Sequence, residues 1–138
     1  MPKLCAACYE VPPTTPPDAR EANLMRLARD GANDSRIQTI ARGLYAMLAE
    51  RLGRTPTREE LVQWLMDAVH LLMDYAPDPP GLEVFQTVQW SIGGECGFSV
   101  SPITGNRKGC GDCEDLATLL VCLCLCLGIT ARVKWIEQ

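Results

Sequence analysis

The segment Leu116–Leu127 constrains the fold of this chain more than any other part of the sequence. It reads LATLLVCLCLCL and would place apolar side chains on nearly every face of a helix. Such a helix is stable only when other elements cover most of its surface. Its 12 residues are fewer than the roughly 18–20 that a bilayer-spanning helix needs. We therefore expect a buried central helix that begins near Cys113 and ends at Gly128.

Three amphipathic helices are predicted to cover this central helix. In three earlier segments, apolar residues recur every three or four positions, which is the spacing of one helix face. Asp34 or Ser35 is a good N-cap for the second of these helices, and Gly53 supplies its C-terminal signal. The predicted spans are about 18–30, 35–52 and 56–75.

Two shorter segments have β character. Val84–Val88 is rich in β-branched and aromatic residues, and Ile129–Ile136 alternates so that Val133 and Trp135 share a face. A lone strand cannot satisfy its backbone, so residues 129–136 should pair with residues 82–101 or with another molecule. The chain therefore predicts a mainly α domain with a small β element, in the α+β class.

Composition and charge are those of an ordinary globular domain. Apolar residues make up 47% of the 138 residues, and the net charge of −4 argues against a nucleic-acid-binding surface. Residues 1–17 hold two Pro-Pro pairs and read as an extended arm, which leaves 18–138 as a single domain. Neither a membrane span nor an apolar leader is evident, so we expect synthesis in the cytoplasm, where disulfides are rare.

Cys113 stands in a context that favours nucleophilic chemistry. It follows the glycine-rich run GCGD at 109–112 and takes the predicted first position of the buried helix. The unpaired N–H groups at a helix start favour anions, so they stabilise a thiolate and can hold an oxyanion beside it. Cys113 is therefore the candidate nucleophile.

The sequence around this cysteine resembles the nucleophile segment of transglutaminase-like (papain-like) cysteine acyl-transfer proteins. The matching residues are GDCEDLATLL followed by LGITAR, and the upstream DPPGLEVFQT is similar to phage- and prophage-encoded members. The resemblance covers residues 35–138 and is most specific over 109–136. It implies a truncated N-terminal lobe of that fold, with the cysteine at the start of a buried central helix.

In that family the catalytic histidine and acid lie on strands after the nucleophile helix, and no histidine follows Cys113 here. The only histidine, His70, lies in the predicted third helix. A base could come from His70 or from a partner chain, because only the spatial arrangement matters in such sites. Without a base, turnover would be poor. We therefore expect a non-catalytic structural or interaction protein, with a thiol acyl-transferase or cysteine peptidase as the alternative.

The cysteine spacing suggests a third reading. Cys5-x-x-Cys8 and Cys110-x-x-Cys113 are two pairs of the kind that bind tetrahedral zinc, and zinc would make Cys113 a ligand instead of a nucleophile. The same pairs could instead form disulfides that tie the arm to the domain in an oxidised particle. Zinc is the only cofactor that the sequence suggests.

Acidic residues flank Cys113. Asp112, Glu114 and Asp115 could bind a metal or a substrate, although acids in a first helical turn more commonly complement the helix dipole. Arg132 belongs to the Ala-Arg pair of the family resemblance. We expect Arg132 to have a structural role, paired with an acid such as Asp115.

The expected partner is another protein or a second copy of the chain. The terminal strand 129–136 would offer an edge for strand addition, and the arm 1–17 would reach a neighbour. We expect neither nucleic acid nor a membrane as partner. The resemblance to phage-encoded proteins implies a component that is assembled into a virus particle after its synthesis.

Overall fold

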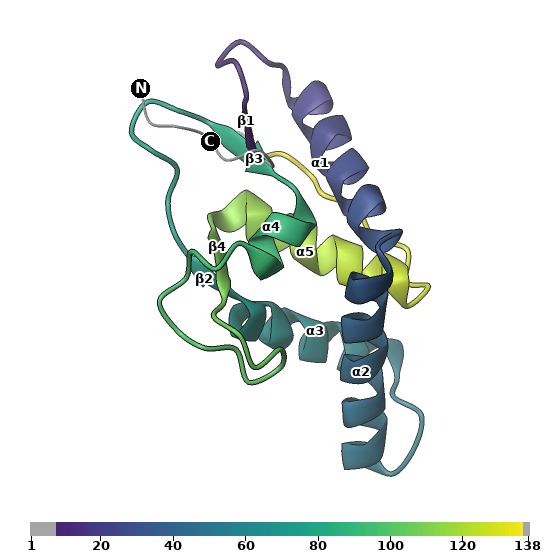
Figure 1. Cartoon of the computed structure of the whole chain (residues 1–138). Coiled ribbons are helices and arrows are strands. Elements are labelled where there is room, and N and C mark those ends of the chain that lie inside the picture. Colours follow the sequence, from purple (N-terminus) through teal and green to yellow (C-terminus); the bar gives the residue numbers. More distant parts are fainter. Residues whose placement is uncertain (1–7, 137–138) are drawn as a thin grey trace.

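The computed structural model describes residues 8–136, which form a mainly helical fold with two small sheets, in the α+β class that the sequence predicts. Helices surround a central helix, α5 (Figure 1). No helix within the described range is long and apolar enough to cross a membrane. The elements are, in chain order, β1 (Cys8–Glu10), α1 (Pro17–Ala32), α2 (Ser35–Leu52), α3 (Arg58–Leu72), β2 (Met73–Tyr75), β3 (Val84–Gln86), α4 (Val88–Gly93), β4 (Gly109–Gly111) and α5 (Cys113–Cys126).

Helix α5 forms the centre of the hydrophobic core, as its sequence predicts. Leu119, Cys122 and Leu123 are fully buried, and α1, α2, α3 and α4 all contact the helix. Burying one leucine side chain contributes about 1.5–3 kcal/mol. The apolar faces of the surrounding helices and the all-round apolar surface of α5 therefore stabilise one another.

Local signals set the ends of α2 and α3. The Asp34 carboxylate accepts hydrogen bonds from N–H groups in the first turn of α2, and Gly53 ends that helix with a φ of 68°. Thr57 and Glu60 form a reciprocal capping box at the start of α3. Helix α3 is shorter than predicted because residues 73–75 leave the helix and form β2.

The pairing of β2 with β4 is parallel and brings the start of α5 beside the end of α3. The sequence predicts neither strand, because each has only three residues and β4 reads Gly-Cys-Gly. Gly111 permits close packing at this point. A Cβ atom there would lie 2.7 Å from both the Cβ atom and a carboxylate oxygen of Asp115.

The prediction that residues 1–17 form an extended arm is wrong for residues 8–11, which join the domain, while residues 1–7 lie outside the described range. Strand β1 pairs antiparallel with β3, and Val11 is buried in the core. The prolines do not keep this segment away from the domain. Pro17 begins α1, where its missing N–H group leaves no hydrogen bond unmade.

The prediction of a terminal strand at 129–136 is also wrong. These residues follow α5 in an irregular extended path and form no strand in the described structure. The predicted alternation of buried and exposed side chains is present even though no strand pairing is formed, since Val133 is buried while Arg132 and Lys134 are exposed. The Val133 N–H group donates to the sulfur of Met25 at 3.2 Å. The sequence pattern specified which side chains face the core, but it could not supply a neighbouring strand.

The segment between β3 and β4 is more ordered than a loop. It contains α4, whose start is capped by the Thr87 hydroxyl, which accepts from the Trp90 N–H group. A disulfide joins Cys96 to Cys110, with their Cα atoms 5.5 Å apart. The expectation that disulfides would be rare is therefore wrong for this pair.

Candidate functional site

Cys113 occupies the first position of α5, as predicted, and its side chain is exposed. It lines a cavity of about 340 Å³ together with Leu24 of α1, Glu114 and Ala117 of α5, and the terminal residues 133–136. The irregular terminal segment therefore forms one wall of the cavity that adjoins the candidate nucleophile.

The surroundings of Cys113 oppose thiolate formation. Partial burial of the sulfur raises the pKa of the thiol, and the negative charges of Glu114 and Asp112 raise it further. The thiol donates a hydrogen bond to Oε2 of Glu114 at 3.4 Å. The helix start was expected to lower this pKa, but burial and the neighbouring carboxylates raise it.

His70, the candidate base, lies in the last turn of α3. Its side chain is exposed on α3, and no hydrogen bond or ion pair among the described residues joins it to the cysteine or its flanking acids. Its backbone carbonyl accepts a hydrogen bond from Nζ of Lys108 at 3.0 Å. The use of His70 as a base for Cys113 stays a prediction.

The four-cysteine zinc set is not assembled either. Cys110 is bonded to Cys96 and cannot supply a thiolate ligand. Cys8 is also disulfide-bonded, Cys113 carries a free thiol, and Cys5 lies outside the described residues. A disulfide from the arm to Cys110 is excluded for the same reason, since that sulfur is bonded within the domain.

Five carboxylates converge at the start of α5 and form what we call the acidic cluster. Oxygens of Asp78, Asp112 and Asp115 lie within 4.8 Å of one another, and so do oxygens of Asp78, Glu83 and Glu114. The sequence points to Asp112, Glu114 and Asp115 at the start of α5 but not to Asp78 and Glu83. They lie about thirty positions earlier in the sequence, and only the fold brings them to the helix start.

The backbone fixes two members of the acidic cluster. The Asp112 N–H group donates to Oδ2 of Asp115 at 3.0 Å, and the Val84 N–H group donates to Oδ2 of Asp78 at 3.0 Å. The predicted pair between Arg132 and Asp115 is not formed, because Asp115 is buried and binds the turn instead. Asp115 therefore has a structural role, but it fixes the turn at the start of α5 instead of pairing with Arg132.

Four carboxyl groups of the acidic cluster have raised pKa values. Burial raises the pKa of Asp112 to about 8, with Asp115 and Asp78 adding to the effect, and burial raises the pKa of Asp115 to about 7. The side-chain hydrogen bond with Glu114 raises the pKa of Glu83 to about 7. Burial raises the pKa of Glu114 as well. The carboxyl groups are held together closely enough that they cannot all be ionised without cost.

Positive charge near the acidic cluster is scarce. Within residues 8–136, its one ion pair is with Arg20, whose Nη1 lies 4.0 Å from Oε1 of Glu83. Arg20 also donates through Nε to the Thr15 carbonyl at 3.0 Å, and its guanidinium lies 4.7 Å from the centre of the Trp135 ring. One arginine with other contacts does not neutralise five carboxylates.

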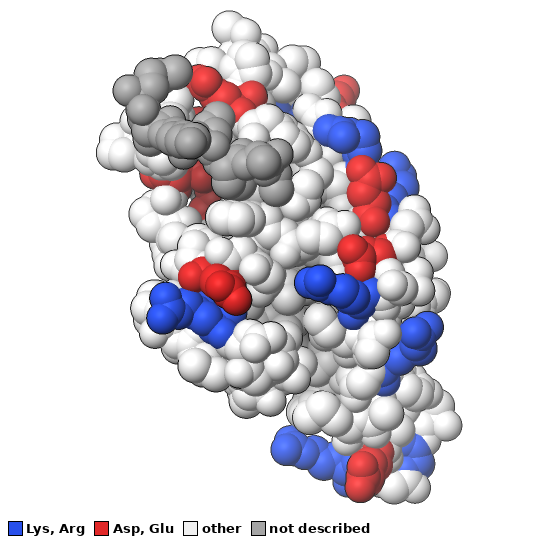
Figure 2. Space-filling model, in the orientation of Figure 1, with Lys and Arg blue, Asp and Glu red and all other residues white. Residues whose placement is uncertain are grey.

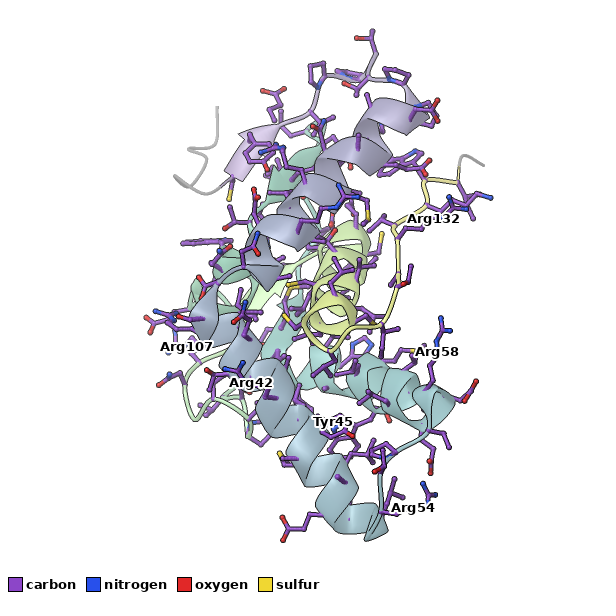
Figure 3. The ribbon with its side chains drawn as sticks, turned by 90° about the vertical axis from the view of Figure 1, so that its right-hand side faces the viewer. Arg42, Tyr45, Arg54, Arg58, Arg107 and Arg132 are labelled. Atoms are coloured by element: carbon purple, nitrogen blue, oxygen red, sulfur yellow. A yellow bond between two sulfur atoms is a disulfide. The ribbon has the colours of Figure 1, made fainter. Side chains whose placement is uncertain are left out.

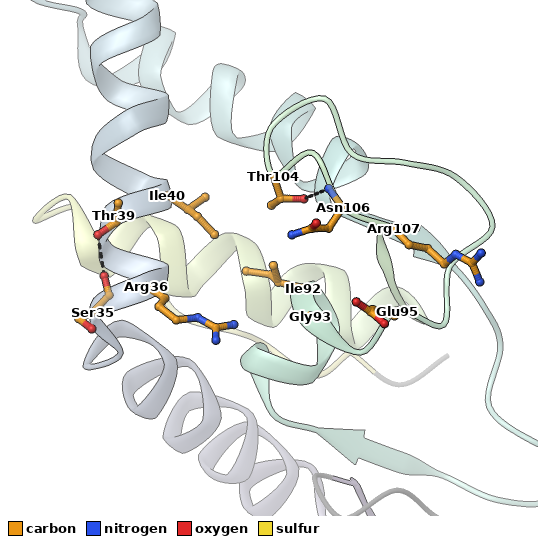
Figure 4. Close-up of a pocket in the computed structure, with 10 residues that line it drawn as sticks. All are labelled: Ser35, Arg36, Thr39, Ile40, Ile92, Gly93, Glu95, Thr104, Asn106 and Arg107. Atoms are coloured by element: carbon orange, nitrogen blue, oxygen red, sulfur yellow. Dashed lines mark hydrogen bonds between the residues drawn. The ribbon is translucent and has the colours of Figure 1, made fainter.

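A second cavity, of about 560 Å³, lies between α2, α4 and the segment that follows α4. Figure 4 shows Arg36 on α2 at one side of it and Arg107 on the opposite side, with Ile92 between them. No member of the acidic cluster lines this cavity. It is a polar hollow that is separate from Cys113.

Basic side chains are spread over several elements. The labelled arginines of Figure 3 come from α2, α3, the loop between them, the segment after α4 and the terminal segment, and Figure 2 shows basic side chains interspersed with acidic ones over the described part of one face. The absence of nucleic acid as a partner stays a prediction.

Comparison with protein-family models, with curated proteins and with solved structures finds no match to this chain, so the chemistry of the site is argued from its own geometry.

Proposed function

We propose that this chain is a non-catalytic protein-interaction module that contacts its partner through the disulfide-closed segment 96–110. The observation that carries the proposal is the exposure of Phe98, which is 84% exposed. Val100 is 65% exposed on the same segment. Phenylalanine and valine are usually buried, and exposed apolar anchors are typical of surfaces that bind other proteins.

The backbone of this segment is fixed. Asp74 accepts hydrogen bonds from the Phe98 N–H group at 2.8 Å and from the Ser99 N–H group at 3.1 Å. The disulfide closes the base of the segment, and Val100 forms a β-bridge with Arg107. A fixed backbone lowers the entropy that is lost when these side chains bind. The exposed residues therefore have the properties of pre-organised contacts.

The expected partner surface is an apolar pocket with acidic residues at its rim. Phe98 and Val100 would fill the pocket, and the exposed Arg107 would meet the acidic rim. This contact replaces the terminal segment and the arm as the proposed interaction surface, because residues 8–10 pair with β3 and Val133 is held against the core by its hydrogen bond to Met25.

The resemblance to phage-encoded transglutaminase-like proteins extends this proposal to a virus particle. The module would be synthesised in the cytoplasm and assembled with a particle protein. The Cys96–Cys110 disulfide fits a protein that leaves the reducing cytoplasm, because disulfides persist in oxidising surroundings.

One observation favours thiol chemistry as a second candidate. Cys113 is exposed beside a cavity of about 340 Å³, large enough to admit a side chain of a substrate. However, the thiol donates its hydrogen bond to the Glu114 carboxylate, and no hydrogen bond among the described residues joins it to a base. The non-catalytic reading is therefore preferred.

A photo-crosslinking amino acid in place of Phe98 tests the interaction proposal in the cells that contain the partner. We expect one dominant adduct with a different protein, identified by mass spectrometry, and its loss when Val100→Asp is added. The control is a crosslinker in place of Met66, an exposed apolar residue on α3. The same adduct from both positions, or adducts only between copies of this chain, would contradict the proposal.

Ammonia release from a glutamine peptide in the presence of a primary amine tests the second candidate. We expect the wild-type chain and the Cys113→Ser variant to release ammonia at the same background rate. Release by the wild type that the Cys113→Ser variant lacks would establish thiol chemistry and overturn the non-catalytic reading.

A further inference from the structure

We infer that the acidic cluster binds a hard divalent cation, and that Ca²⁺ fits it best. Its two trios of oxygens share Asp78, and within each trio the oxygens lie within 4.8 Å of one another. Two ligands on opposite sides of a Ca²⁺ ion are about 4.8 Å apart, because each Ca–O distance is about 2.4 Å. Each trio therefore already has the spacing of a partial ligand shell.

A buried oxygen without a donor points to the ligand independently of this spacing. Asp112 is buried, and its Oδ1 atom has no hydrogen-bond partner in the described structure. The groups that face it are the carboxyls of Asp78, Glu114 and Asp115, which donate a hydrogen bond only when protonated. A buried carboxylate oxygen is costly unless it is paired with a donor or coordinates a metal. A cation within the cluster would satisfy it.

The charge balance also favours a cation. Arg20 reaches only Glu83, at 4.0 Å, and is held by the Thr15 carbonyl. A divalent ion would screen the repulsion among the remaining carboxylates far better than this distant guanidinium does. Lys134 lines the neighbouring Cys113 cavity but forms no ion pair with the cluster among the described residues.

The ligand chemistry selects among cations. Carboxylate oxygens suit Mg²⁺, Ca²⁺ and Mn²⁺, whereas zinc sites usually include sulfur or nitrogen ligands. Mg²⁺ requires short bonds in a nearly ideal octahedron and gives up its water reluctantly, while Ca²⁺ accepts several carboxylates in a flexible shell. Five carboxylates from a loop, a strand entry and a helix start are a flexible, oxygen-rich set.

Binding would connect three parts of the fold. Asp78 comes from the segment between β2 and β3, Glu83 directly precedes β3, and Asp112 directly precedes α5. A bound ion would therefore link the β1–β3 sheet to the central helix. Because Glu114 also lines the Cys113 cavity, the ion would reshape the electrostatics of that cavity as well. This inference is independent of the proposed partner contact at Phe98.

Thermal unfolding of the full chain at pH 7.5 tests the inference, first in EDTA and then in excess CaCl₂ or MgCl₂. We expect Ca²⁺ to raise the unfolding midpoint by roughly 10 °C at a hundredfold excess over its dissociation constant. Mg²⁺ at the same concentration should give a smaller shift. Terbium luminescence excited through Trp135, which lines the adjoining cavity, should appear on Tb³⁺ addition and be displaced by Ca²⁺.

Two variants and one control locate the effect. Asp112→Asn keeps the shape of the side chain and removes the negative charge of the carboxylate whose Oδ1 atom has no donor. Glu83→Gln removes one negative charge from the other trio in the same way. Both should lose most of the Ca²⁺ shift and of the Tb³⁺ signal. Glu59→Gln removes an exposed acid from the first turn of α3, and this control should keep both.

A wild-type chain without any Ca²⁺ shift would overturn the inference, and so would an equal loss of the shift in Glu59→Gln, which would indicate non-specific screening. If Asp112→Asn does not fold, Glu83→Gln decides the question, because Glu83 is only half-buried at the edge of the cluster.

Discussion

Asp74 and Asp112 are equally buried, each being 7% exposed, but their surroundings are opposite. Asp74 accepts hydrogen bonds from the N–H groups of Phe98 and Ser99 and from the Ser99 hydroxyl, and Lys108 lies 3.6 Å away. Burial alone would raise the pKa of Asp74, but these partners lower it below its usual value. Burial raises the pKa of Asp112 to about 8, and the neighbouring acids Asp115 and Asp78 add to the rise instead of offsetting it.

The difference shows that burial alone does not tell what a carboxylate is for. The hydrogen bonds and the ion pair of the Asp74 carboxylate all come from this chain, and Asp74 anchors the segment that carries Phe98. One oxygen of Asp112, Oδ1, has no hydrogen-bond partner in the described structure, and the side chain faces a shared space with Asp78. The first arrangement is typical of a structural hydrogen-bond centre, and the second is typical of a site whose partner comes from outside.

The largest expected effect is that of Asp74→Asn. The amide cannot accept all the hydrogen bonds of the carboxylate, and it leaves Lys108 without its ion pair, so we expect a loss of about 3 kcal/mol in the free energy of unfolding. Denaturant titration measures it. Asp67→Asn, on the exposed face of α3, should change stability by less than about 0.5 kcal/mol. If Asp74→Asn cost no more stability than Asp67→Asn, the carboxylate of Asp74 would not be what anchors the Phe98 segment.

The matching change at the other site should have the opposite sign. In EDTA at pH 8, Asp112→Asn removes negative charge from a buried carboxyl group whose Oδ1 atom has no donor, so we expect the free energy of unfolding to rise by about 1–2 kcal/mol. The same denaturant titration applies. A loss of stability comparable to that of Asp74→Asn would mean that Asp112 makes contacts as valuable as those of Asp74.

The dependence of stability on pH should also separate the two sites. The folded-state pKa values of about 8 for Asp112 and about 7 for Glu83 exceed the ordinary 3.8 and 4.5. The folded state therefore holds more protons, and the stability from these groups is present at low pH and lost as the pH rises through 7 to 8. The lowered pKa of Asp74 has the opposite sign, so its contribution is lost as the pH falls below its ordinary value.

In EDTA, the unfolding midpoint should therefore be highest in mildly acidic buffer and should fall by a few degrees toward pH 8. Calorimetric scans between pH 4 and pH 9 measure this profile, and the Asp112→Asn variant should flatten its alkaline side. A midpoint that climbs steadily toward pH 8 would rule out the burial of uncompensated carboxyls.

The smallest expected effect is that of Lys108→Met. Asp74 keeps its hydrogen bonds to Phe98 and Ser99, so the variant loses one ion pair at 3.6 Å and one hydrogen bond to the His70 carbonyl. We expect a cost of about 1 kcal/mol. A cost equal to that of Asp74→Asn would mean that the lysine, and not the backbone N–H groups, holds the carboxylate in place.

Local sequence signals predicted the helical frame well because each signal acts within a few residues. The side chain of Asp34 reaches the N–H groups of the next turn, and Gly53 adopts the left-handed conformation that ends a helix. The apolar run 116–127 could only be stable in the interior. The sequence also placed Cys113 correctly at the start of α5.

The candidate site depended on contacts that no local pattern encodes. Nothing between Asp78 and Asp112 in the sequence indicates that they meet, and the pairing of β2 with β4 is too short to predict. The reactivity of Cys113 stays a prediction, because the helix start alone does not reveal the burial and the neighbouring acids that raise the pKa of its thiol in the folded chain.

The sequence by itself determined the helices, their caps and the burial of α5, since backbone hydrogen bonds within a helix and apolar periodicity are local properties. Only the tertiary structure decided that Cys96 pairs with Cys110, that residues 129–136 pack onto the core without a strand partner, and that five acids share one site. These outcomes require groups distant in sequence to meet, and the energies of burial and charge that govern them depend on every neighbour at once.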